Sequence, residues 1–139
     1  MFTPAHFNEL GAPNLPGHVG LEITFVGPSE VRAALPIAPF LMAPNGFLAA
    51  GGIVTLADTA AGYGCVAHLP AQATGFTTLE LKCNHLGTAR QGTLDCTAKA
   101  LHLGRTTQVW DAEVTHRETG RTLALFRCTQ LLIYGNPVA

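Results

Sequence analysis

Residues 51–63 read GGIVTLADTAAGY and place one carboxylate, Asp58, in the middle of an apolar segment rich in small residues. Between Arg32 and Glu80, Asp58 is the only residue that carries a formal charge at neutral pH. Burying a carboxylate costs free energy unless the group caps a helix, pairs with a cation or takes part in chemistry. Asp58 is therefore the first candidate for a reactive group. The alternative is a structural carboxylate that bonds to backbone or to a partner chain.

The segment around Asp58 predicts one long helix over about residues 47–66. Apolar residues such as Ile53, Leu56 and Tyr63 recur at helical spacing. The small residues between them would let this helix approach a sheet or another helix closely. Because the segment contains a carboxylate and lacks basic residues at its ends, a buried helix is favoured over a membrane span.

Alternation of polar and apolar residues predicts six strands, two before the long helix and four after it. They cover about residues 21–25, 31–37, 76–84, 93–103, 106–116 and 121–134. A short helix over about residues 3–10 and loops over 12–17 and 38–46 complete the chain. The turns between the last four strands are short enough for antiparallel hairpins. This order predicts a single α+β domain over residues 1–139, with a curved antiparallel sheet wrapped around one long helix.

Composition excludes several classes of protein. Hydrophobic residues make up 47% of the 139 residues and charged residues 12%, which favours an oligomer that hides apolar surface. The net charge of −1 and the scattered basic residues argue against nucleic-acid binding. Neither the four cysteines nor the six histidines have the spacing of a metal site, so we expect no metal and reduced thiols. The start of the chain has no secretory signal, which predicts a cytoplasmic protein.

The order of these elements, with glycines and then Leu56-Ala57-Asp58 in the long helix, resembles the hotdog-fold acyl-CoA thioesterases. The 4-hydroxybenzoyl-CoA thioesterases and the PaaI-type enzymes of the phenylacetate pathway are most similar. The resemblance runs over about residues 18–134 and implies a hotdog fold without a cofactor. It also implies a homodimer or homotetramer that hydrolyses acyl-CoA to free acid and CoA. In this family the carboxylate and the amide that stabilises the oxyanion come from helices of opposite subunits.

The family motif is His-Gly-Gly, with the acid eight residues after the first glycine. Counting back from Asp58 places Ala50 at the first glycine, Gly51 at the second and Ala49 at the motif histidine. Alanine keeps its backbone N–H, so an oxyanion hole at Ala50 or Gly51 is expected near the start of the helix. The alternative alignment pairs Gly51 and Gly52 with the motif glycines. It moves the acid by about 100° around the helix, and we prefer the first.

The resemblance implies further site residues, each with a structural alternative. Asn45 is similar to the polar residue that precedes the motif and orients water or the carbonyl, but it also suits a turn. Thr77 is similar to a Ser or Thr near the carboxylate, or it is simply a strand residue. Gly104 and Arg105 lie where relatives contact the phosphates of CoA, and a solvated arginine is equally compatible. His85, near the end of a strand, either approaches the site or lies on the surface.

Two other functions stay open on the same fold. A hydratase or dehydratase acting on acyl thioesters would pair its acid with a histidine, and no histidine lies near Asp58 in the chain. A non-catalytic acyl-CoA-binding protein would explain the loss of the motif histidine. The sequence does not distinguish Asp58 as nucleophile from Asp58 as general base. Phe47, Leu48, Tyr63 and Phe76 indicate an apolar or aromatic acyl group, or they belong to the core.

Overall fold

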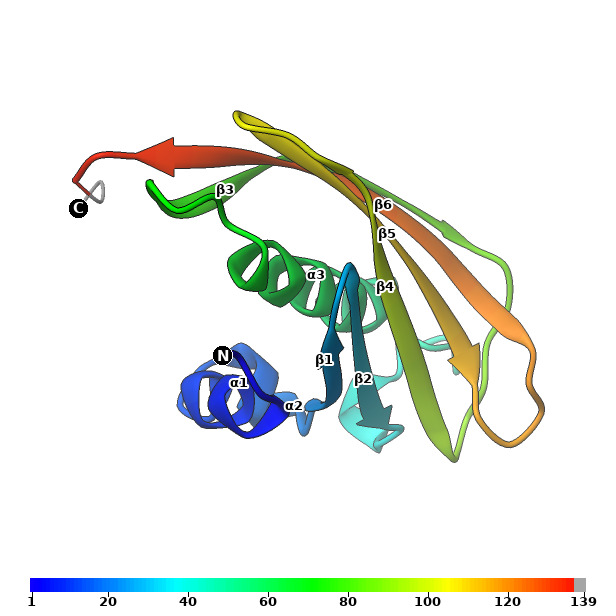
Figure 1. The fold of residues 1–139 in the computed structure, drawn as a ribbon. Coiled ribbons are helices and arrows are strands. Elements are labelled where there is room, and N and C mark those ends of the chain that lie inside the picture. Colours follow the sequence, from blue (N-terminus) through cyan, green and yellow to red (C-terminus); the bar gives the residue numbers. More distant parts are fainter. Residues whose placement is uncertain (137–139) are drawn as a thin grey trace.

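A curved antiparallel sheet wraps around one long helix in the computed structural model, which describes residues 1–136 (Figure 1). The strand order in the sheet is β1-β2-β4-β5-β6-β3, and all neighbouring strands are antiparallel. The elements are α1 (Pro4–Gly11), α2 (Leu15–Val19), β1 (Glu22–Gly27), β2 (Glu30–Pro36), the 3-10 turn η1 (Pro39–Leu41), α3 (Ala50–Ala67), β3 (Ala73–His85), β4 (Thr93–Leu103), β5 (Thr107–His116) and β6 (Thr122–Tyr134). The predicted α+β architecture, a curved antiparallel sheet around one long helix, is confirmed.

The long helix begins later than its sequence pattern predicts. Ala49 has an extended backbone, and Leu48 forms a bridge with Met42, so the helix begins only at Ala50. The loop predicted over residues 12–17 also needs correction, because α2 occupies its second half. Pro16 suits the first turn of that helix, and Gly20 ends it in the left-handed conformation.

Helix α3 packs very closely against the concave face of the sheet. A Cβ atom at Gly64 would lie 2.6 Å from Cη2 of Trp110, a fully buried residue of β5. A Cβ atom at Gly62 would lie 3.2 Å from Cζ of Phe76 on β3. Because these glycines have no Cβ atom, the helix can lie this close to the sheet.

Helices α1 and α2 lie on the side of α3 away from β3 (Figure 1). The Phe7 ring of α1 stacks on Tyr63 of α3, with 4.5 Å between ring centroids. Tyr63 therefore takes part in the packing between α1 and α3. Within residues 1–136, no helix combines the length and apolar character that crossing a bilayer requires.

Strand β3 forms one edge of the sheet and is unusually exposed. It is 13 residues long, whereas β1 at the opposite edge has six. Leu79 and Leu81 of β3 are 55% and 41% exposed. Long exposed edge strands with apolar side chains are normally covered or paired in native proteins.

Two glycine substitutions on the same helix test the packing of α3. Gly64→Ala should lower the free energy of unfolding by about 1–3 kcal/mol, because the new methyl group meets the Trp110 ring. Gly51→Ala should leave it unchanged or raise it by up to about 1 kcal/mol, since no atom of the described residues lies within 4 Å of the added carbon. Urea denaturation checks both. Equal effects of the two substitutions would contradict the close approach.

Candidate active site

Asp58 lies on the side of α3 that faces β3. It precedes Gly62 by one helical turn, and Gly62 packs directly on Phe76 of β3. Its Oδ1 atom is buried and has no hydrogen-bond partner in the part of the chain that the structure describes. Buried carboxylate oxygens are rarely left without a donor, so such an atom needs a functional explanation.

Polar side chains of β3 and β6 form hydrogen bonds with one another. Thr78 Oγ1 donates to Oε1 of the fully buried Gln130 at 2.7 Å, and Gln130 Nε2 lies 3.4 Å from Cys128 Sγ. Both Gln130 and Cys128 are on β6, which pairs with β3. Cys128 lies close enough to Asp58 for the carboxylate to affect its thiol, yet the Asp58 Oδ1 atom receives no hydrogen bond from any of these groups.

Desolvation dominates the electrostatics of this region. Burial raises the pKa of Asp58 above its ordinary value of 3.8. Burial, followed by the negative charge of Asp58, raises the pKa of Cys128 to about 12. The Cys128 thiol therefore stays neutral at physiological pH, and burial makes the Asp58 carboxylate a stronger proton acceptor than an exposed aspartate.

The first turn of α3 offers free backbone donors. The Ala49 carbonyl accepts hydrogen bonds from the N–H groups of Gly52 and Ile53, at 3.0 and 3.4 Å. The N–H groups of Ala50 and Gly51 have no acceptor among residues 1–136, and both residues are exposed. Unpaired N–H groups at a helix N-terminus attract negative charge.

A surface pocket of about 410 Å³ lies beside this turn. Its lining includes Ala50 and Ile53 of α3, Phe47 and Leu48 of the preceding loop, and His85 at the end of β3. The predicted apolar pocket residues Phe47 and Leu48 are thus close to the first turn of α3, whereas Phe76 packs against Gly62, one helical turn beyond Asp58.

Loop contacts hold this pocket in shape. The N–H of Leu48 donates to Thr88 Oγ1 at 2.9 Å, and Arg90 Nε donates to the Gly46 carbonyl at 3.2 Å. These contacts join the loop before α3 to the segment over residues 86–92, which follows β3.

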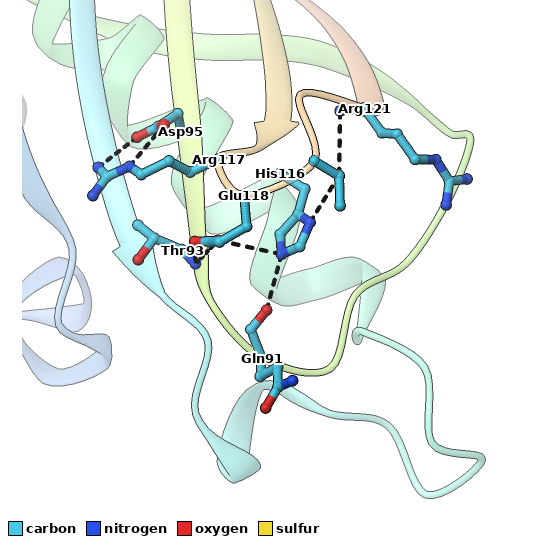
Figure 2. Close-up of polar contacts among 8 residues, drawn as sticks. Gln91, Thr93, Asp95, His116, Arg117, Glu118 and Arg121 are labelled. Carbon is cyan, nitrogen blue, oxygen red and sulfur yellow. Dashed lines mark hydrogen bonds and ion pairs between the residues drawn. The ribbon is translucent and has the colours of Figure 1, made fainter.

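A hydrogen bond joins the segment over residues 86–92 to the β5–β6 hairpin (Figure 2). His116 Nε2 donates to the Gln91 carbonyl at 2.9 Å, and Glu118 accepts from the Thr93 N–H at 2.8 Å. Arg117 and Asp95 form an exposed ion pair beside them. The segment that contributes Leu86, Gly87 and Thr88 to the pocket is therefore bonded to the end of the sheet.

The structure separates two of the other predicted residues from Asp58. Thr77 pairs with Leu131, and both are exposed on the face of β3 and β6 directed away from α3. Thr78 is the threonine on the face toward α3. Asn45 lies in an exposed turn, where its Oδ1 accepts from the Phe47 N–H at 3.1 Å and its Nδ2 is not engaged in that bond.

Gly104 and Arg105 occupy the β4–β5 turn, where the Gly104 N–H donates to the Thr107 carbonyl at 2.9 Å. The Tyr134 hydroxyl donates to the Arg105 carbonyl, and Tyr134 pairs with Ala73 at the start of β3. This turn is therefore near the beginning of β3, whereas the pocket beside Ala50 is near its end.

Asp58 and the free amides are too far apart to act together within one protomer. Eight residues of helix separate Ala50 from Asp58, which corresponds to about 12 Å along the axis. No group of three or more His, Cys, Asp or Glu within residues 1–136 is arranged to hold a metal ion. Within one protomer, the carboxylate and the free amides at the start of α3 therefore lie at different places along the helix.

Comparison with known proteins identifies the family. Residues 45–124, more than half of the chain and including α3, match the thioesterase superfamily. The chain belongs to the thioesterase superfamily. It is 34% identical over 111 residues to a 1,4-dihydroxy-2-naphthoyl-CoA hydrolase of Listeria monocytogenes, covering 80% of this chain and 89% of that protein.

Two further relatives of this superfamily member agree. An Escherichia coli 1,4-dihydroxy-2-naphthoyl-CoA hydrolase is 31% identical over 129 residues, covering 91% of each chain. The crystal structure of a Haemophilus influenzae thioesterase superposes with a TM-score of 0.89 at 28% identity, covering 96% of this chain and 92% of that one. The resemblance noted in the sequence is therefore confirmed for family and fold.

The stability of an Asp58→Asn variant tests the desolvation of this carboxylate. Because the folded pKa is raised, the folded state binds the proton more tightly than the unfolded chain does. The contribution of Asp58 to the free energy of unfolding is thus highest at low pH and falls as the pH rises from 3.8 through the raised folded value. At pH 7 the variant should be more stable than the wild type, and the difference should shrink toward pH 4.

Urea denaturation at a series of pH values measures this difference. Asp95→Asn is the matched control, since Asp95 is exposed and pairs with Arg117, and its loss should give no gain in stability at pH 7. An Asp58→Asn variant that is less stable than the wild type at pH 7 would show that the carboxylate has a structural partner.

Proposed function

We propose that this superfamily member hydrolyses an acyl-CoA thioester to a free acid and CoA. The observation that carries the proposal is the buried, unpartnered Oδ1 of Asp58 on the helix that the family match includes. A thioesterase needs a carboxylate that attacks the carbonyl or activates water, and donors for the oxyanion that develops. This chain has both features, on two different parts of α3.

A homodimer formed through β3 would bring the two parts together. β3 is a long edge strand with exposed leucines, which makes it the natural surface for pairing with a second copy. In a two-fold dimer the paired β3 strands run antiparallel. The end of one β3, next to Ala50, then lies opposite the beginning of the other, next to Phe76 and Asp58. A tetramer of two such dimers is compatible with this proposal.

Each active site of this dimer would combine Asp58 of one subunit with the partner subunit's Ala50 and the partner subunit's Gly51. The thioester carbonyl points its oxygen at these amides, where the helix N-terminus stabilises the oxyanion. Asp58 accepts a proton from the water that adds to the carbonyl carbon. The C–S bond then breaks and CoA leaves as its thiolate. Direct attack by Asp58 to give a mixed anhydride uses the same geometry.

The raised pKa of Asp58 fits the role of general base. Burial brings the pKa closer to the working pH, which makes the ionised carboxylate a stronger proton acceptor than an exposed aspartate. The activity of the enzyme should consequently be lost at acidic pH as Asp58 becomes protonated.

The remaining predicted residues have supporting roles in this proposal. Arg105 lies in the turn near the start of β3, and we expect its guanidinium to bind the phosphates of CoA. Asn45 keeps its Nδ2 group for the substrate carbonyl or water. Thr77 faces away from α3, so Thr78 is the better candidate for a contact near the carboxylate. We place the protein in the cytoplasm, as the sequence led us to expect.

Two relatives act on a bicyclic aromatic acyl-CoA according to their names. Phe76 beside Asp58, and Phe47 and Leu48 in the pocket, provide apolar surface that suits an aromatic acyl group. We therefore expect aromatic acyl-CoA thioesters to be better substrates than short aliphatic ones.

Thiol release from a panel of short, aromatic and long acyl-CoA thioesters tests the function. The wild type should release CoA, and Asp58→Asn should lower kcat by about 10²–10⁴-fold with the fold intact. Asp95→Asn, on the exposed face of β4, should keep wild-type kinetics.

Other outcomes would favour the alternatives. Binding of acyl-CoA without turnover by the folded wild type would indicate a binding protein. Addition of water to an enoyl-CoA without thiol release would indicate a hydratase.

A further inference from the structure

His85 is the one histidine that lies beside the free amides of α3. It is the last residue of β3 and pairs with Ala124, a fully buried residue on the face of the sheet directed toward α3. His85 lines the 410 Å³ pocket together with Ala50. The imidazole and the first turn of α3 thus border the same cavity, although 35 residues separate them in the chain.

The His85 imidazole is available for a ligand. Among residues 1–136 it makes no hydrogen bond or ion pair, whereas the imidazoles of His68 and His116 are engaged at both ring nitrogens. The other polar side chain of the pocket, Thr88, already accepts from the Leu48 N–H. His85 is therefore the free polar side chain in an otherwise apolar lining.

The pocket also lacks the histidine that the family motif would supply, since Ala49 stands at that position. We propose that His85 donates a hydrogen bond to the thioester carbonyl beside the amides of Ala50 and Gly51, and so completes the oxyanion hole from the end of β3. This inference rests on the proposed thioesterase function. A second donor aimed at the oxyanion lowers the barrier because its interaction strengthens as negative charge develops.

Kinetics of His85 variants test the inference. His85→Ala should lower kcat for acyl-CoA hydrolysis about 10²-fold, with a small change in KM. His85→Gln keeps an N–H donor and should recover part of this loss, whereas His85→Phe fills the space without a donor and should not. His18→Ala on α2 is the control and should behave as the wild type, because His18 is exposed and does not line the pocket.

The pH dependence of kcat distinguishes a hydrogen-bond donor to the thioester carbonyl from a group that acts through the Asp58 carboxylate. Since His85 transfers no proton in this scheme, the acidic limb of the profile should stay in place in His85→Gln. Thermal unfolding of each variant should match the wild type, because His85 is exposed and has no partner among the described residues.

Several results would overturn the inference. His85 is not the carbonyl donor if kcat is unchanged in His85→Ala, if the Gln and Phe variants lose equal activity, or if the acidic limb of the pH profile is displaced. Each of these results would leave the proposed thioesterase function standing. A wild type that releases no thiol from any acyl-CoA would instead overturn the proposed function, and this inference with it.

Discussion

The close approach of α3 to the concave sheet is the constraint on which this structure depends. Glycine at positions 62 and 64 lets the helix backbone lie against Phe76 and Trp110. The same close packing buries Asp58 against β3, where its Oδ1 atom has no hydrogen-bond partner among the described residues. A bulkier helix would stand off from the sheet and leave the carboxylate in water, where its pKa would be ordinary. In the proposed mechanism, the packing that stabilises the fold therefore also prepares the catalytic carboxylate, at a cost in stability.

A second consequence follows for the proposed mechanism, in which one chain presents two incomplete halves of a site. Asp58 faces the first half of β3, and the free amides of Ala50 and Gly51 lie near the end of the same strand. The exposed edge of β3 lies between them. Pairing of two copies along this edge would cover its apolar surface and would also bring the two halves of the site together. In this account, association and catalysis have one structural origin.

Much of the fold follows from periodicity, because alternating strands and one apolar helix leave few arrangements open. The isolated charge of Asp58 also marked it correctly as unusually placed. Thr77 illustrates what local patterns miss: a register shift in β3 between Thr78 and Glu80, together with the pairing to β6, decides which threonine faces α3. His85 could be suspected but not located, since only the tertiary fold brings the end of β3 to the first turn of α3.

Complementation between two inactive variants tests the shared site most directly. Asp58→Asn removes the carboxylate, and Ala50→Pro removes the amide N–H at the first helical position, where proline is tolerated. Each variant alone should be nearly inactive. After subunits are mixed by co-expression, half of the dimers are hybrids and each hybrid holds one intact site, so about a quarter of wild-type activity should return. Mixed subunits that stay as inactive as the separate variants would contradict an active site built from two chains.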